Sequence, residues 1–263
     1  SELHVVDPVR VTTLVTLGLV LVLISLGGAV RATDSGLACP DWPLCYGKVV
    51  PRQADIPEGS GYTLWNVWLE HTHRLVASVV SVLIVVLAVW VLRARRSTRV
   101  LVPILGALVA VLAQGVLGAL VVLHLLHGEL VTAHLGMSMV VVACLVMAAV
   151  RLGAGRGESA VLDARQRRGT VVVAGLVFVQ LLVGSQVTGQ HASLAYGRDP
   201  LRFHGHFFPT TITTVPEAYH LAHRLLAYTT AAAVLITAAR MWRRKRDRRL
   251  WSSASTARPH WPS

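Results

Sequence analysis

Charged residues are scarce in this chain: they make up 14% of its 263 residues, whereas 54% are hydrophobic. The apolar residues gather in runs of roughly 18–25, enough to cross about 30 Å of hydrocarbon at 1.5 Å per residue. Core helices of soluble proteins are rarely so long and so uniformly apolar. The composition therefore excludes an ordinary soluble domain and predicts a polytopic membrane protein. A cleavable signal is not evident either, because the first apolar run exceeds a typical signal-peptide core.

We predict an all-α fold with six transmembrane spans, at residues 11–30, 67–92, 100–123, 129–150, 170–187 and 215–239. In the third span, Gly106, Gly115 and Gly118 allow close helix–helix approach in lipid. Pro103 is expected in the first turn of that helix, where its missing amide donor costs little. The third span is most simply a packing element.

Acidic residues are also few: there are 13, against 25 lysines and arginines, for a net charge of +12. Eighteen of the 25 basic residues lie before the first span, in the second and fourth loops, or after the sixth span. Positive residues collect on the cytoplasmic face of a membrane. We therefore expect both termini in the cytoplasm and the long loops 31–66 and 188–214 outside the cell membrane. The basic run 243–249 is interpreted as an orientation anchor, not a nucleic-acid site.

Cysteine is rare as well, with three residues in the chain. Cys144 lies inside the fourth span and is expected to be a small core residue. Cys39 and Cys45 share the first outer loop, where an oxidising compartment permits a disulfide. A metal site is the alternative, but it needs further ligands nearby and the loop sequence offers none, so we favour the disulfide.

Three histidines recur at one depth in the membrane. His73, His134 and His223 each lie roughly 7–12 Å inside the outer end of a span, and the first and third share the sequence His-Arg-Leu. A repeated intramembrane histidine is a functional-site hypothesis by default. Haem iron held between imidazoles of facing helices explains the pattern best. Zinc fits less well, because no further ligand completes a tetrahedral set at that depth, and a hydrogen-bonded polar residue is the other alternative.

The two His-Arg-Leu sequences are 150 residues apart, which indicates an internal repeat. The first four spans form one unit, and the fifth and sixth begin a second copy. We predict a four-helix bundle over 1–155 and an incomplete second bundle over 156–263. The counterpart of His134 would fall near position 284, so we expect the second bundle to lack its last two helices, either by truncation or in a variant completed by self-association.

Two kinds of charged residue accompany the histidines. Glu70 lies one turn before His73 on the same helical face, and is either an acid–base group beside the ligand or the partner of an ion pair with Arg74. Its counterpart in the repeat is His220, which suggests one reactive site and one redox site. Arg74 and Arg224 could contact haem propionates or satisfy polar groups at helix ends.

The remaining histidines are not expected to be ligands. His71 is two residues from His73 and must face another direction. Five others are interpreted as solvated loop residues: His124, His127, His191, His204 and His206.

Five stretches of the chain resemble the haem A synthase family. They are GGAVRATDSGLACPDWPLCYGKVVP (27–51), EHTHRLVAS (70–78), QGVLGALVVL (114–123), AHLGMSM (133–139) and LAHRLLAY (221–228). The first two in combination are highly specific, and members of the family are built as two duplicated four-helix bundles.

The resemblance implies an oxidoreductase that converts the C8 methyl group of haem O to a formyl group by successive hydroxylations. It implies that His73 and His134 hold substrate haem O, that Glu70 is the catalytic carboxylate, and that His223 is one ligand of a haem b cofactor. It also implies a Cys39–Cys45 disulfide near the substrate site. The family's fourth haem-ligating histidine is absent from the chain.

The same resemblance implies partners: haem O synthase, cytochrome c oxidase assembly and membrane lipid, with a homo-oligomer as a further possibility. Two alternatives compete with the enzyme. One is a b-type membrane cytochrome that relays electrons, which has no need of Glu70; the other is a haem-binding or haem-transfer protein without catalysis.

Overall fold

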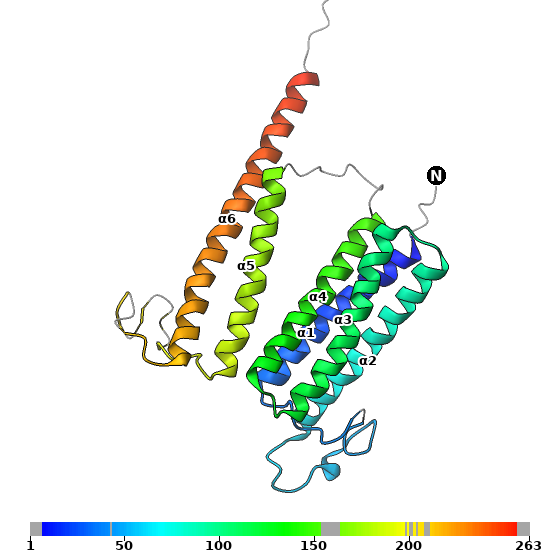
Figure 1. Ribbon diagram of the computed structural model, residues 1–263, viewed down its shortest axis with the longest axis vertical. Helices are drawn as coiled ribbons and strands as arrows, with labels where there is room; N and C mark the ends of the chain where they lie inside the picture. The colour runs from blue at the N-terminus through cyan, green and yellow to red at the C-terminus, as the bar shows by residue number, and fades with distance from the viewer. Residues whose placement is uncertain are drawn as a thin grey trace, which may run out of the picture. The chain divides into compact units, whose positions relative to one another are not determined.

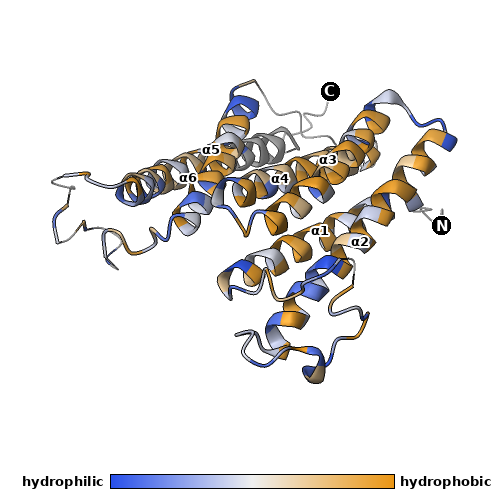
Figure 2. Ribbon diagram, turned by 60° about the horizontal axis from the view of Figure 1, so that its bottom comes forward, coloured by the Kyte–Doolittle hydropathy of each residue, from blue (hydrophilic) through white to orange (hydrophobic). Residues whose placement is uncertain are grey.

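The computed structural model describes residues 7–42, 44–153, 164–197, 199, 202–203, 205–207 and 211–256, with side chains of the last helix described as far as Arg244. The described residues are helical apart from loops, one 3₁₀ turn and two isolated β-bridges. Six helices are long and apolar enough to cross a membrane, which confirms the prediction of an all-α protein with six spans. Hydrophobic residues cover the helices and hydrophilic residues gather at the ends and in the loops (Figure 2).

The chain divides into two compact units, Ser1–Ser159 and Ala160–Ser263, here called the four-helix unit and the hairpin unit. The four-helix unit contains α1 (Pro8–Ala32), α2 (Leu64–Arg93), α3 (Thr98–Leu123) and α4 (Gly128–Gly153). Neighbours in space are α1 and α2, α2 and α3, α3 and α4, and α4 and α1 (Figure 1). The helices therefore close into a ring in which α2 and α4 are diagonal and run in the same direction.

Local sequence signals explain where the helices of this unit begin. Asp7 caps α1 by accepting a hydrogen bond from the Val9 amide (3.1 Å), and Pro8 takes the first helical position, where no amide donor is needed. Thr63 and Asn66 form a reciprocal capping box at the start of α2. The core between the helices is built from small and branched apolar residues, and Cys144 is buried in it at 9% exposure, as expected.

The expectation for Pro103 was wrong by one turn. Because α3 begins at Thr98, Pro103 lies inside the helix, where it leaves the carbonyl of Arg99 without its usual amide donor. The guanidinium of Arg151 on α4 donates to that carbonyl at 2.5 Å. Arg151, near the end of α4, thus supplies the hydrogen bond that the backbone of α3 lacks at Arg99.

The hairpin unit consists of α5 (Ala164–Gly189) and α6 (Val215–Thr256), which pack against each other. The part of α6 apolar enough to span a membrane is Val215–Arg244. In the apolar 18-residue stretch of each of these two helices, 6% of the residues are buried, against 22–28% in the corresponding stretches of α1–α4. Packing of α5 against α6 alone therefore leaves most of the apolar surface of the hairpin uncovered.

Candidate functional site

The three intramembrane histidines share one packing arrangement. The ring of each lies against a glycine of the helix that precedes it: His73 against Gly27, His134 against Gly118, and His223 against Gly184. A methyl group on these glycines would approach ring atom Cε1 to 3.0, 3.3 and 2.8 Å, respectively. The glycines provide the space in which each imidazole sits.

His73 and His134 belong to the diagonal helices α2 and α4, both half-buried. The Nδ1 atoms of both rings are buried and have no hydrogen-bond partner among the residues that the structure describes. A buried polar atom without a partner is costly in a bundle interior, so the two imidazoles carry hydrogen-bonding or ligating capacity that the described residues leave unused.

Glu70 lies one turn before His73 and is 3% exposed. Its Oε2 accepts a hydrogen bond from the Cys39 amide at 2.8 Å, and its Oε1 forms an ion pair with Arg74. Arg74 also donates to the carbonyls of Cys39, at 3.2 Å, and Asp41. The helical turn that contains His73 therefore also binds the first outer loop, through Glu70 and Arg74.

The repeat reproduces this anchor in the hairpin unit. Arg224 donates from Nε to Nε2 of His220 (3.0 Å) and from its terminal nitrogens to the carbonyls of Arg202 (2.8 Å) and Gly197 (3.1 Å). The Tyr196 amide approaches Nδ1 of His220 at 3.3 Å. His220 thus takes the structural place of Glu70, and each arginine holds an outer loop against its helix.

Cys39 and Cys45 form a disulfide, as predicted. It lies in a small core that the first outer loop makes over the start of α2. His71 is fully buried beside it, with Nε2 at 2.9 Å from the Val49 carbonyl. Sequence reasoning missed this neighbour of His71, because the contact depends on the first outer loop folding back over α2.

Sequence reasoning also missed the glycine partners and Gln180. The amide nitrogen of Gln180 on α5 is 3.1 Å from Nδ1 and 3.3 Å from Nε2 of His223. The recurrence of glycine one helix before each histidine was the available signal. His124, His127, His191 and His206 are exposed, as expected, while His204 lies outside the described residues.

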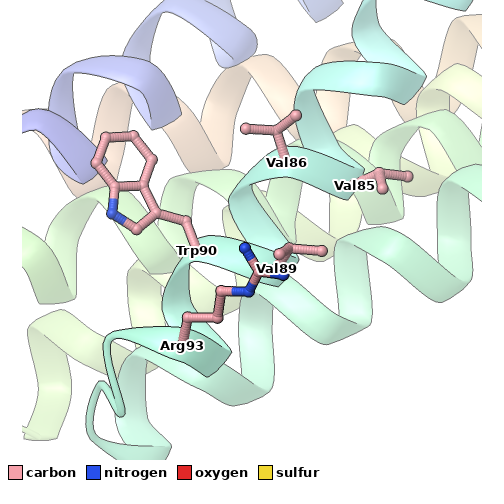
Figure 3. Close-up of a pocket in the computed structure, with 5 residues that line it drawn as sticks. All are labelled: Val85, Val86, Val89, Trp90 and Arg93. Carbon is pink, nitrogen blue, oxygen red and sulfur yellow. The ribbon is translucent and has the colours of Figure 1, made fainter.

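A separate hollow is lined by Val85, Val86, Val89, Trp90 and Arg93 (Figure 3). All five residues belong to the last turns of α2, and Val85 is twelve residues from His73, about 18 Å along the helix. The hollow contributes nothing to the histidine site.

The fold and these residues define an all-helical, multi-pass membrane protein with paired histidines inside a four-helix bundle. The chain belongs to the COX15-CtaA family of cytochrome oxidase assembly proteins, whose profile matches residues 10–258.

Curated relatives bear the name haem A synthase. The protein from Exiguobacterium sp. strain AT1b is 36% identical over 156 residues, which is 58% of this chain and 48% of the relative. The protein from Halalkalibacterium halodurans is 27% identical over 88% of this chain and 74% of its own length. The protein from Nitrosospira multiformis is 29% identical over 98% of this chain and 82% of its own. The chain thus spans about half of the first relative and more of the others.

Proposed function

We propose that the four-helix unit binds haem O, with His73 and His134 as iron ligands. The observation that carries the proposal is the pair of histidines on diagonal helices of one bundle, each with a buried ring nitrogen that has no hydrogen-bond partner among the described residues. Histidines on facing helices are the usual haem ligands in such bundles. The two glycine contacts add support, because they hold each ring at a defined place.

We propose further that the reaction is the oxidation of the haem O C8 methyl group to a formyl group, making haem A for cytochrome c oxidase. Each of two hydroxylations removes two electrons from the carbon and adds one oxygen atom, so the reaction requires an external electron acceptor and water or dioxygen as the oxygen source. The product of the second is a geminal diol, which loses water to become the aldehyde. Haem iron supplies the redox chemistry when it is bound. Glu70 supplies a carboxylate one turn from His73, held in place by the Cys39 amide and Arg74.

His223 is proposed as one ligand of haem b in the hairpin unit. Its ring faces the amide of Gln180, and within the described part of this unit His191 and His206 are exposed while His220 binds Arg224. A second imidazole is therefore not placed opposite His223 by the described residues, and we derive no electron-transfer step through this site. Propionate contacts for Arg74 and Arg224 stay a prediction, since both guanidinium groups already donate to loop carbonyls.

In the membrane, the proposed orientation has both termini in the cytoplasm and the anchored loops outside. Arg96, Arg99 and Arg151 lie at the end of the four-helix unit opposite the disulfide loop, which fits the positive-inside rule. Haem O synthase would supply the substrate, and cytochrome c oxidase assembly would consume the product. Self-association remains part of the proposal.

A b-type cytochrome that relays electrons is the second candidate. One observation favours it: the carboxylate of Glu70 has a structural role as the anchor of the first outer loop, which an electron carrier could also use. The two candidates differ in whether loss of the charge at position 70 abolishes a product or only loosens a loop.

Expression with haem O synthase, in a host that lacks its own haem A synthase, tests the proposal. In a protein that carries a complete second bundle, chromatography of the extracted haems should show haem A both without further change and with Glu58→Gln, an exposed loop carboxylate that serves as the control. Glu70→Gln in the same protein should still bind haem but yield no haem A. Only haem O and haem b from the unsubstituted protein would refute the enzyme, and an unchanged haem A yield from Glu70→Gln would refute its catalytic role.

A further inference from the structure

A second cluster of metal-type ligands lies apart from the paired histidines. The sulfur atoms of Cys39 and Cys45 and one ring nitrogen of His71 all lie within 4.8 Å of one another. The three residues are 2%, 0% and 0% exposed. They meet because the loop between α1 and α2 folds back over the first turns of α2 and forms a small core with Val67.

The hydrogen bond of His71 determines which ring nitrogen is available. Nε2 lies 2.9 Å from the Val49 carbonyl oxygen, and a carbonyl only accepts, so Nε2 carries the proton. In the neutral ring the lone pair is then on Nδ1, which is buried without a hydrogen-bond partner among the described residues. Metal-binding histidines are typically oriented in this way, with the other ring nitrogen donating to a backbone carbonyl.

The ring of His71 is also held by its neighbour. Trp68, one turn earlier on α2, packs edge-on against it, with ring centroids 5.8 Å apart and planes at 69°. On the loop side, the backbone of Cys39 is held by Glu70 and Arg74. The backbone of Cys39 and the ring of His71 are thus held in place, and preorganisation of this kind favours metal binding once reduction has separated the two sulfur atoms.

We propose that Cys39, Cys45 and His71 bind a thiophilic d¹⁰ cation, Zn²⁺ in particular, when the disulfide is reduced. Two thiolates and an imidazole are donors that such ions prefer. Two thiolate charges neutralise a dication, so a Zn²⁺ cluster would be neutral where the three side chains are buried. Cu⁺ would leave one net negative charge there, and burial of an unpaired charge is costly. The site is independent of haem.

A dithiol reductant gives two electrons and two protons to the Cys39–Cys45 disulfide, which becomes two thiols, while the reductant becomes a disulfide. Zn²⁺ then displaces the two thiol protons to solvent and forms two Zn–S bonds. His71 adds its Nδ1 lone pair and loses no proton. The fourth position is left for water or another oxygen ligand.

Metal titration of the purified full chain tests the proposal. A Cys144→Ala background leaves the loop pair as the only source of thiols. The oxidised and the reduced protein are each titrated with Zn²⁺ against a chromophoric chelator without oxygen, and then with Cu⁺. We expect one equivalent of Zn²⁺ to bind the reduced protein and none to bind the oxidised protein.

His71→Ala should weaken Zn²⁺ binding at least about 100-fold, because loss of a mere second-shell partner already costs about 10–100-fold. His124→Ala removes an exposed outer-loop histidine and should change nothing. In the oxidised His71→Ala protein, absence of free thiols shows that the loop still brings the two cysteines together. In the reduced parent, a thiolate-to-metal charge-transfer band with Co²⁺ reports coordination directly.

Three results would overturn the proposal. The first is equal Zn²⁺ binding by oxidised and reduced protein. The second is unchanged affinity in His71→Ala. The third is failure of both Zn²⁺ and Cu⁺ to bind although two thiols titrate. Binding of Cu⁺ alone would keep the site and refute the charge argument for Zn²⁺.

Discussion

Replacement of Gly27 by alanine should weaken haem binding without unfolding the four-helix unit. The new Cβ would lie 3.0 Å from Cε1 of His73, 3.5 Å from Nδ1 and 3.8 Å from Nε2. Carbon atoms favour separations of about 3.5–4.0 Å, so the ring must retreat by roughly half an ångström. Overpacking of this kind lowers the free energy of unfolding by about 1–3 kcal/mol. Replacing a helical glycine by alanine raises it by about 1 kcal/mol, because alanine has the higher helix propensity, so the net loss of stability is small.

The displaced ring should affect ligand binding more than folding. The side chains that bind a ligand must be held within about 0.5 Å of the positions they take in the complex. A loss of about 1.4–2.8 kcal/mol in binding corresponds to roughly 10–100-fold weaker affinity for haem. Spectroscopic titration of the purified protein with haem measures this directly, in a His223→Ala background that removes the ligand of the hairpin unit.

Gly28 provides the control for this experiment. It follows Gly27 on α1, and a Cβ built on it would meet nothing within 4 Å. Gly28→Ala therefore adds the same methyl group and the same helix propensity without touching His73. If Gly27→Ala and Gly28→Ala bind haem with equal affinity, the contact with Gly27 does not determine where the His73 ring is held for haem binding.

Further predictions concern the hairpin unit and the first outer loop. Gly184→Ala, whose Cβ would lie 2.8 Å from the histidine ring, should reduce haem absorbance of that unit, whereas Gly175→Ala, which meets nothing within 4 Å, should not. Arg224→Gln should expose the second outer loop to proteases, since it removes donors to two loop carbonyls; unchanged cleavage would contradict the anchor. The hydrogen bond from Lys48 holds the pKa of Asp55 below its usual range, so this contact should persist at neutral pH and be lost as the pH falls through that lowered pKa. Asp55→Asn should remove the acid dependence of loop proteolysis.

Hydropathy and periodicity were sufficient for the six helices, because a span is a local property of about twenty residues. The repeat also identified His220 as the counterpart of Glu70, although the structure shows the pair as equivalent loop anchors. The chemical roles of Glu70 and His220, one in a reactive site and one in a redox site, stay predictions.

Contacts between segments were harder to predict. The contact between His73 and Gly27 depends on how α1 and α2 are rotated about their axes, and a local sequence pattern does not predict that rotation. His71 meets the disulfide only because the loop reverses over α2. The cysteine pair could be predicted because Cys39 and Cys45 are close together in one outer loop. Their third neighbour, His71, is more than twenty residues away in sequence and was not predicted.

The contact between Arg151 and the Arg99 carbonyl has an evolutionary consequence. With an ordinary residue at position 103, that carbonyl would have its own amide donor and would not need the guanidinium; with Pro103, Arg151 is the donor that the described structure provides for it. The two positions should therefore be epistatic. Arg151→Ala should destabilise the protein that keeps Pro103 and be nearly neutral beside Pro103→Ala, so that the order in which the two sites change decides which lineages can lose the arginine.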